Sequence, residues 1–312
     1  MIGLENFRRF CLIHVQENLY DRFVIECAYV GTGNRAPVNP KDKQSKSGQG
    51  TNRNLIGFYE EAYRTGAANV FSNWEATEAD TAVAEAFDWT GLHVLDIGCG
   101  TGRCARKLRG AGAAGVVAVD YSKEAIRLAT SETSDRGIEF ICSDFLDFTP
   151  AVTFDVIVTL GTLEHMDDPI AFLRHAARHM KPTGKLVVTC PHFMNLRGIV
   201  WMTLSKLFDI PMSLSDLHFI HPWDMEAWCA EASLKVVSTS SLDAARGNGD
   251  RLIVDFEKRL PNAFRDAGLP TDRVSDMMAY LTNYTSHITD NKENNEFEGA
   301  TALYVIEHDG TL

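Results

Sequence analysis

Three alternating glycines directly after a short apolar run constrain the fold of this chain more than any other feature. Residues 94–97 are Val-Leu-Asp-Ile, which predicts a buried strand of a parallel sheet. Gly98, Gly100 and Gly102 follow, and residues 101–108 predict a helix. Such a turn forms a cradle for an anionic or polar ligand, because free N–H groups point outward and no Cβ blocks close approach.

The spacing of the glycines separates two kinds of nucleoside ligand. Nicotinamide-binding folds carry Gly-x-Gly-x-x-Gly, whereas this chain has Arg103 where the third glycine is expected and Asp96 just upstream. The pattern resembles the first motif of class I S-adenosylmethionine-dependent methyltransferases, in which the turn holds the methionine end of the cofactor. An acid suits the free amino group and the sulfonium there. We therefore expect S-adenosylmethionine as the cofactor.

A second apolar strand, residues 115–120, ends in Asp120. An acid at the end of the second strand of a doubly wound fold can accept hydrogen bonds from both ribose hydroxyls, so Asp120 is the expected ribose ligand. The alternative is that Asp120 or Ser122 only caps the next helix, predicted at residues 123–133.

The third predicted strand, residues 137–142, leads into Ser143, Asp144 and Phe145. The resemblance implies that Asp144 binds the adenine amino group and that the neighbouring backbone N–H reads the ring. It also implies that the Phe145 side chain covers the base.

The next segments continue the alternation of strand and helix. Residues 154–160 predict a fourth strand, and Asp-Pro at 168–169 predicts a helix start with Asp as the N-cap and Pro at the first helical position. The helix covers residues 170–180, a turn covers 181–185, and a fifth strand covers 186–190.

These motifs agree in order over residues 91–190, together with a Leu-Glu-His-x-x-Asp-Pro stretch at 163–169. The region resembles the ubiquinone-biosynthesis type of O-methyltransferase and its small-molecule relatives, although the usual Pro-Gly-Gly turn is here Pro-Thr-Gly. The resemblance implies a Rossmann-like doubly wound α/β sheet, mostly parallel with an antiparallel last strand. Helical insertions beyond the fifth strand are expected to form a lid. The resemblance also implies these cofactor-binding residues: Tyr59, Tyr63, Asp96, Gly98, Cys99, Gly100, Gly102, Asp120, Tyr121, Ser143, Asp144, Phe145, Leu160, Gly161 and His165.

Composition predicts three regions along the chain. Residues 1–32 form an N-terminal appendage, and residues 33–54, which have almost no large apolar side chain, form a flexible linker. Residues 55–312 form the methyltransferase domain, with substrate-side insertions at about 191–222 and 243–298. Beyond the fifth strand we expect helices at 223–232, 252–264 and 273–284, and strands at 234–240 and 301–307.

Two helices, at residues 55–71 and 76–87, should precede the core. The first contains Tyr59 and Tyr63, for which two interpretations stand side by side. The helix either packs an aromatic stripe on the sheet or closes over the cofactor, as a Tyr-rich helix does in many small-molecule methyltransferases.

Charge and cysteine usage restrict the partners and the compartment. The formal net charge of -12 disfavours binding a phosphate backbone, so we expect no nucleic acid partner. The 7 cysteines lack paired metal-ligand spacing and suggest reduced thiols in a cytoplasmic protein. Neither an apolar run long enough to span a membrane nor a signal peptide is evident. The sequence leaves the oligomeric state open, a homodimer included.

Three histidines, His165, His218 and His221, are candidates for the base that takes a substrate proton. The spacing of His218 and His221 would also suit two metal ligands, but no third soft ligand is evident, and we predict no metal site. His221 precedes Pro222 at a helix start, where Ser, Thr or Asp would cap better, so a role other than capping is expected for it.

The predicted reaction is methyl transfer to a small organic molecule, to oxygen before nitrogen, within an apolar lid. Methylation of nitrogen, or cofactor binding without chemistry, are the alternatives. A nicotinamide-dependent oxidoreductase is disfavoured by the glycine spacing.

Overall fold

The computed structural model describes residues 55–65, 75–210, 216–288 and 298–310, all within a compact unit that spans Gly50–Leu312. The predicted appendage at 1–32 and the linker at 33–54 lie outside these ranges. Among the described residues, no helix is long and apolar enough to cross a membrane. The five described cysteines are free thiols, and Cys142 is the exposed one of the five.

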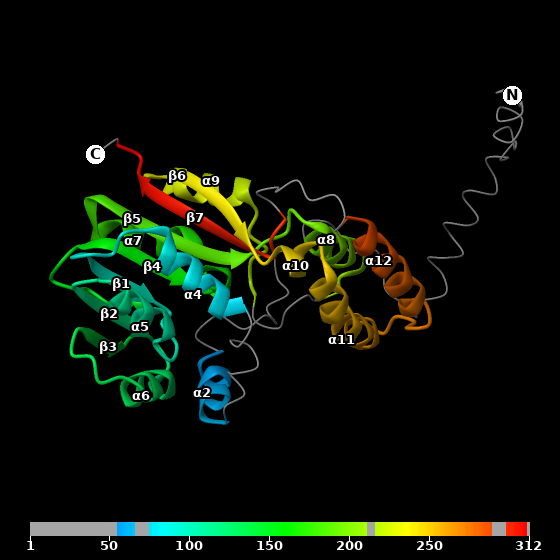
Figure 1. The fold of residues 1–312 in the computed structure, drawn as a ribbon, viewed down its shortest axis with the longest axis horizontal. Helices are drawn as coiled ribbons and strands as arrows, with labels where there is room; N and C mark the ends of the chain where they lie inside the picture. The colour runs from blue at the N-terminus through cyan, green and yellow to red at the C-terminus, as the bar shows by residue number, and fades with distance from the viewer. Residues whose placement is uncertain (1–54, 66–74, 211–215, 289–297, 311–312) are drawn as a thin grey trace, which may run out of the picture. The chain divides into compact units, whose positions relative to one another are not determined.

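In the described part of the chain, seven strands form one sheet in the order β3-β2-β1-β4-β5-β7-β6 (Figure 1). Their bounds are β1 His93–Ile97, β2 Gly115–Asp120, β3 Ile138–Cys142, β4 Phe154–Leu160, β5 Met180–Pro191, β6 Leu234–Leu242 and β7 Thr301–His308. The first five strands are parallel, and β7 runs antiparallel to both of its neighbours. The predicted Rossmann-like sheet with an antiparallel last strand is therefore confirmed.

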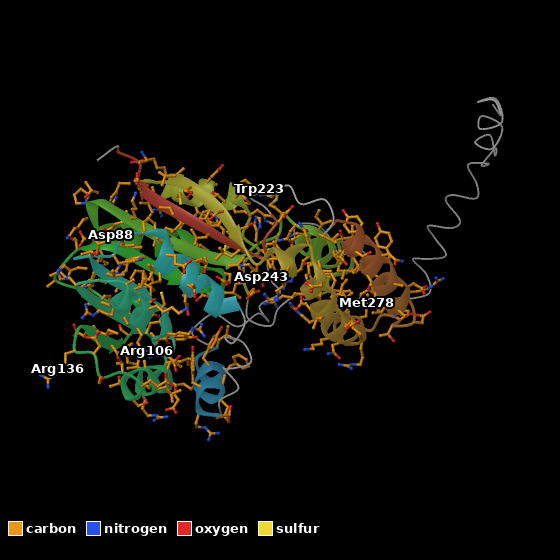
Figure 2. The ribbon with its side chains drawn as sticks, viewed as in Figure 1. Asp88, Arg106, Arg136, Trp223, Asp243 and Met278 are labelled. Carbon is orange, nitrogen blue, oxygen red and sulfur yellow. The ribbon has the colours of Figure 1, made fainter. Side chains whose placement is uncertain are left out.

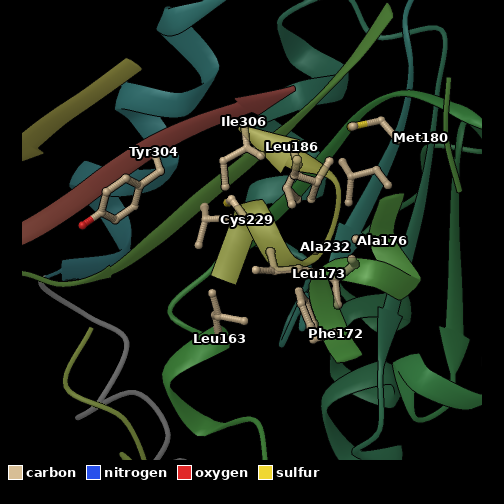
Figure 3. Close-up of a cluster of buried hydrophobic side chains, with 14 of the residues drawn as sticks. Leu163, Phe172, Leu173, Ala176, Met180, Leu186, Cys229, Ala232, Tyr304 and Ile306 are labelled. Carbon is tan, nitrogen blue, oxygen red and sulfur yellow. The ribbon is translucent and has the colours of Figure 1, made fainter. Parts of the chain in front are cut away.

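Helices cover both faces of the sheet because side chains alternate between the faces along each strand. Val94 belongs to a core with α4 (Glu75–Ala86) and α5 (Arg103–Gly110), on the face that α6 (Lys123–Ser131) also covers. Leu95 belongs to the opposite core with α7 (Pro169–His179) and α9 (Pro222–Glu231), shown in Figure 3. Each such fully buried aliphatic side chain contributes roughly 1.5–3 kcal/mol through the hydrophobic effect.

Two local predictions had different outcomes. Asp168 accepts a hydrogen bond from the Ala171 N–H at 2.9 Å and Pro169 is the first residue of α7, so the predicted helix start is confirmed. The turn predicted at residues 181–185 was wrong, because β5 begins at Met180, which pairs with Phe154 ahead of a register shift.

The two insertions form a helical body with its own hydrophobic core. The body contains α8 (Leu196–Phe208), α10 (Ala244–Gly247), α11 (Asp250–Asp266) and α12 (Val274–Ile288). Its buried side chains include Trp201 of α8, Phe256 of α11 and Leu281 of α12. Predictions for α11 and α12 are confirmed in type, although each helix extends beyond its predicted range.

Both insertions leave the sheet at one edge. The carboxyl ends of β5 and β6 lead into them, and β7, which is antiparallel, begins at that same edge. Asp243, labelled in Figure 2, marks the junction: its carbonyl accepts the Ala300 N–H at 3.1 Å and its carboxylate pairs with Arg251 at 3.0 Å. In open α/β sheets this is the edge at which ligands bind.

Candidate active site

The glycine turn joins β1 to α5 and has a backbone that only glycine adopts without strain. The φ angles are 71° at Gly98, 52° at Gly100 and 75° at Gly102. A Cβ at Gly100 would lie 2.9 Å from the Tyr63 hydroxyl, and one at Gly102 would lie 2.5 Å from the Phe140 ring. The turn is therefore closed to larger residues both by conformation and by space.

Asp120 links the end of β2 to this turn. One carboxylate oxygen accepts the Gly100 N–H and the other accepts the Ser122 N–H, both at 2.9 Å. Burial raises the pKa of Asp120, and these two hydrogen bonds oppose the rise. The helix that follows is capped instead by Ser122, whose hydroxyl accepts the Ala125 N–H at 3.1 Å. Each Asp120 oxygen has capacity for one further hydrogen bond from a ligand.

Asp96 lies beneath the turn and is only 1% exposed. Burial, together with the nearby Asp80 carboxyl, raises the pKa of Asp96 to about 8, while an N–H bond from Ala105 opposes the rise. Its Oδ2 atom is buried and has no hydrogen-bond partner among the described residues. Asp96 therefore offers an unused acceptor or, when protonated, a donor at the base of the turn.

The residues at the end of β3 that were predicted to bind adenine make contacts within the protein. Asp144 accepts the Leu146 N–H at 3.0 Å and so caps a short 3-10 helix, η3 (Phe145–Asp147), while the Ser143 hydroxyl donates to the Asp144 carbonyl. The Phe145 ring is buried and packs 4.9 Å from Phe172 of α7. Because this ring belongs to the core beneath the sheet, its packing does not favour the predicted role of covering a base.

Helix α2 (Ile56–Thr65) carries two tyrosines over the turn. The Tyr63 hydroxyl faces Gly100, and burial followed by the Asp120 charge raises the pKa of Tyr63. The Tyr59 ring lies 6.0 Å from the Tyr121 ring, edge to face. Tyr121 has a buried hydroxyl without a hydrogen-bond partner among the described residues. Of the two interpretations of this helix, the geometry favours the one that closes over the turn.

His165 ends a second 3-10 helix, η4 (Leu163–His165), just beyond β4 and the half-buried Leu160. Gly161 between them has a φ angle of 62°, and its N–H donates to the Thr189 carbonyl at 2.9 Å. His165 Nδ1 lies 3.4 Å from Asp216 Oδ1, and the Tyr59 ring is 6.3 Å from the imidazole. The His165 and Asp216 side chains are 18% and 12% exposed, so the pair is enclosed yet reachable.

The other two candidate histidines are held by structural contacts. The His218 ring donates to the Met166 carbonyl at 2.8 Å. The backbone N–H and the ring Nδ1 of His221 both lie 3.0 Å from Asp224 Oδ2, at the start of α9. Asp224 thus holds His221 at the start of the helix, and a role of His221 beyond this contact stays a prediction. Among the described residues no group of three or more His, Cys, Asp or Glu is arranged to hold a metal ion.

A cavity of about 640 Å³ opens beside the loop that contains Asp216. The loop is pinned to η4 because the Leu217 and His218 N–H groups both donate to the Glu164 carbonyl, at 2.8 and 3.1 Å. Aromatic, apolar and a few polar residues line the cavity: Met202, Lys206, Leu217, His218, Phe219, His221, Trp223, Asp224 and Trp228. The lining includes Leu217 and His218, which directly follow Asp216 in the chain, but no residue of the glycine turn.

The sequence did not reveal that Asp216 is the partner of His165. It also did not explain why position 103 is an arginine. Asp216 lies 51 residues beyond His165, in a segment without periodic pattern, so the sequence carries no signal that would pair the two. Arg103, at the position of the absent third glycine, forms an ion pair with the buried Asp80 of α4.

Residues 95–188 match the family described as "Methyltransferase domain". The chain is 40% identical over 104 residues to the cypemycin N-terminal methyltransferase of a Streptomyces species, an alignment that covers 32% of this chain and 42% of that protein. It is 29% identical over 159 residues to the ubiquinone biosynthesis O-methyltransferase of Coxiella burnetii, covering 49% and 67% respectively. The alignment to the first of these relatives thus spans less than half of its length.

Among solved structures, a methyltransferase from the complex with the Haloferax volcanii Trm112 methyltransferase activator has a similar fold. Its TM-score is 0.54 at 19% identity, with 80% of this chain and 97% of that chain covered. The sheet order, the glycine turn and the family match over residues 95–188 are similar to those of the class I S-adenosylmethionine-dependent methyltransferases.

Residues 95–188 of this chain thus match a methyltransferase domain, and the match supports S-adenosylmethionine as the cofactor. The residues present fit the cofactor, because the turn excludes side chains and leaves room for close approach. The spare acceptor capacity of Asp120 and the unpaired oxygen of Asp96 fit it as well.

Proposed function

We propose that this protein methylates a small organic molecule, most readily at oxygen, with His165 as the base. The observation that carries the proposal is the His165–Asp216 pair at the carboxyl end of β4, beside Tyr59 on α2. An alcohol or phenol must lose its proton as it is methylated, and histidine suits that transfer at neutral pH. Asp216 orients the imidazole and stabilises it once it is protonated.

Asp120 and Asp144 bind the nucleoside part of the cofactor in this proposal. Asp120 accepts the ribose hydroxyls with the capacity left by Gly100 and Ser122, and Asp144 accepts the adenine amino group. When bound, S-adenosylmethionine supplies a methyl group activated on a sulfonium. The described residues contribute by orienting the two reactants and by excluding water, the main effects needed for an in-line displacement.

The acceptor enters beside the loop that carries Asp216, from the side of the aromatic cavity. Its volume of about 640 Å³ is in the range of small-molecule pockets, and its lining mixes apolar rings with a few polar groups. The net charge of -12 argues against a nucleic acid acceptor. The longer of the two alignments, to a ubiquinone biosynthesis O-methyltransferase, supports oxygen as the acceptor atom.

Methylation of an amine is the second candidate, favoured by the 40% identity to an N-terminal methyltransferase. An ammonium acceptor must also lose a proton before it attacks, so the same base would serve. The two functions are separated by incubating the protein with methyl-tritiated cofactor and a panel of phenols, alcohols and amines. NMR of the labelled product then identifies the methylated atom.

Replacing His165 by alanine tests the base. We expect turnover on the acceptor found in that panel to fall by roughly 10²–10⁴-fold, with unchanged affinity for S-adenosylhomocysteine. Asp216→Asn should lower turnover less, since the imidazole remains. His93→Ala, an exposed histidine at the opposite edge of the sheet, is the matched control. Near wild-type turnover in His165→Ala would eliminate this assignment.

A further inference from the structure

The first turn of α6 is capped by side chains from two distant parts of the chain. The Ser122 hydroxyl accepts the Ala125 N–H at 3.1 Å. The Glu60 carboxylate accepts the N–H groups of Lys123 and Glu124, at 2.7 and 3.1 Å. N–H groups in the first turn of a helix have no partner within the helix. Glu60, 63 residues upstream on α2, therefore completes the cap of α6.

This contact fixes α2 at one defined place. Helix α6 begins directly after Asp120 and Tyr121, and α2 lies beside it in Figure 1. On either side of Glu60 along α2, Tyr59 packs near Tyr121 and Tyr63 faces the glycine turn. One short helix thus contacts both the glycine turn and the end of β2, and Glu60, which binds α6, lies between the two tyrosines along the helix.

We infer that Glu60 is a positioning residue that latches α2 across the cradle and so determines how long the cofactor is retained. The inference rests on the proposed location of the cofactor at the glycine turn and Asp120. A carboxylate suits this place because the N-terminus of a helix carries partial positive charge, and charge-assisted hydrogen bonds are about twice as strong as neutral ones. In this arrangement the two tyrosines cover the bound cofactor, and Glu60 attaches α2 to α6.

The neighbouring Glu61 provides a matched control. It lies on the same helix and has the same charge, but its side chain is 58% exposed and pairs with Arg64 one turn away. Replacing Glu61 therefore alters the charge and helix propensity of α2 as much as replacing Glu60, without touching α6.

The full-length protein and its Glu60→Ala, Glu60→Gln and Glu61→Ala variants are compared in two measurements. Stopped-flow displacement gives the dissociation rate of S-adenosylhomocysteine, and hydrogen exchange of the cofactor-free protein gives the protection of the Lys123 and Glu124 amides. Glu60→Ala should raise the dissociation rate of S-adenosylhomocysteine and the exchange rate of the two amides, each by roughly ten- to a hundredfold. The reason is that two hydrogen bonds to a charged group are lost. Glu60→Gln, which keeps one acceptor oxygen, should lie between, and Glu61→Ala should match the wild type.

A steady-state comparison separates positioning from general damage. Glu60→Ala should raise KM for S-adenosylmethionine while kcat and the melting temperature stay close to those of Glu61→Ala. Equal dissociation rates and equal amide protection in the two alanine variants would overturn the latch while leaving the cofactor site intact. Failure of the wild type to bind S-adenosylhomocysteine would overturn the proposed site itself, and the latch with it.

Discussion

Replacing Asp120 by asparagine tests the cofactor site at its most constrained side chain. The two carboxylate oxygens hold the N–H groups of Gly100 and Ser122, each at 2.9 Å. Asparagine keeps the size but turns one oxygen into an NH₂ group, which then faces a backbone N–H. One buried donor loses its acceptor, so we expect the free energy of unfolding to fall by about 1–3 kcal/mol.

The same substitution should weaken cofactor binding by a separate amount. The amide lacks both the charge and one of the acceptors that Asp120 offers to ribose hydroxyls. A hydrogen bond to a charged group contributes about 1.5–3 kcal/mol, so affinity for S-adenosylhomocysteine should fall roughly 10- to 100-fold. Isothermal titration calorimetry measures the affinity, and thermal unfolding measures the stability.

Asp155→Asn is the control for effects on stability alone. Asp155 accepts the His93 N–H at 2.9 Å and pairs with Lys181 at 2.7 Å, at the edge of the sheet away from the cradle. We expect Asp155→Asn to lower the melting temperature with unchanged affinity. If Asp120→Asn also kept its affinity within about threefold of the wild type, the assignment of the ribose to β2 would be refuted.

Two further predictions concern stability. Gly102→Ala should lower the free energy of unfolding, measured in urea titrations, by about 1–3 kcal/mol. The φ angle of Gly102 is 75°, and the new Cβ would lie 2.5 Å from Phe140. Gly110→Ala is the control and should be neutral or stabilising, because nothing lies within 4 Å of its Cβ. Burial lowers the pKa of His192 despite its hydrogen bond to the Gly299 carbonyl, so the neutral ring stabilises the fold. The contribution of His192 to the free energy of unfolding should be complete above about pH 6.5, the pKa of histidine in the unfolded chain. It should decline as the pH falls below that value. Urea midpoints at pH 7.5 and 5.5 measure this loss, and an equal loss in His192→Asn would contradict it.

The sequence predicted the strands best where apolar runs are unbroken. Both β2 and β4 match their predicted bounds, because β-branched residues between turn signals leave no competing pattern. The helix after the glycine turn begins at Arg103 and not at residue 101, since the left-handed Gly102 is its N-cap. The segment at 181–185 has the composition of a turn, and only pairing with β4 shows that β5 already begins at Met180.

The candidate site was predicted from the sequence only where its residues are close along the chain. The Gly100 N–H of the glycine turn donates to the Asp120 carboxylate, a contact that follows from the strand, turn and helix pattern of this segment. The direction of the Phe145 ring depends on a 3-10 turn and on Phe172, neither of which has a local signal. Asp216 and Glu60 reach the site only through tertiary packing, so no spacing rule could have found them.

The position of β7 has a consequence for the order in which this sheet assembles. β7 is the last strand along the chain, yet it lies inside the sheet between β5 and β6. During synthesis on the ribosome, β5 and β6 therefore wait with open edges until residues 301–308 emerge, after the whole helical body has been made. Unpaired strand edges can pair with strands of other chains. The nascent chain is therefore prone to aggregation until β7 pairs with β5 and β6.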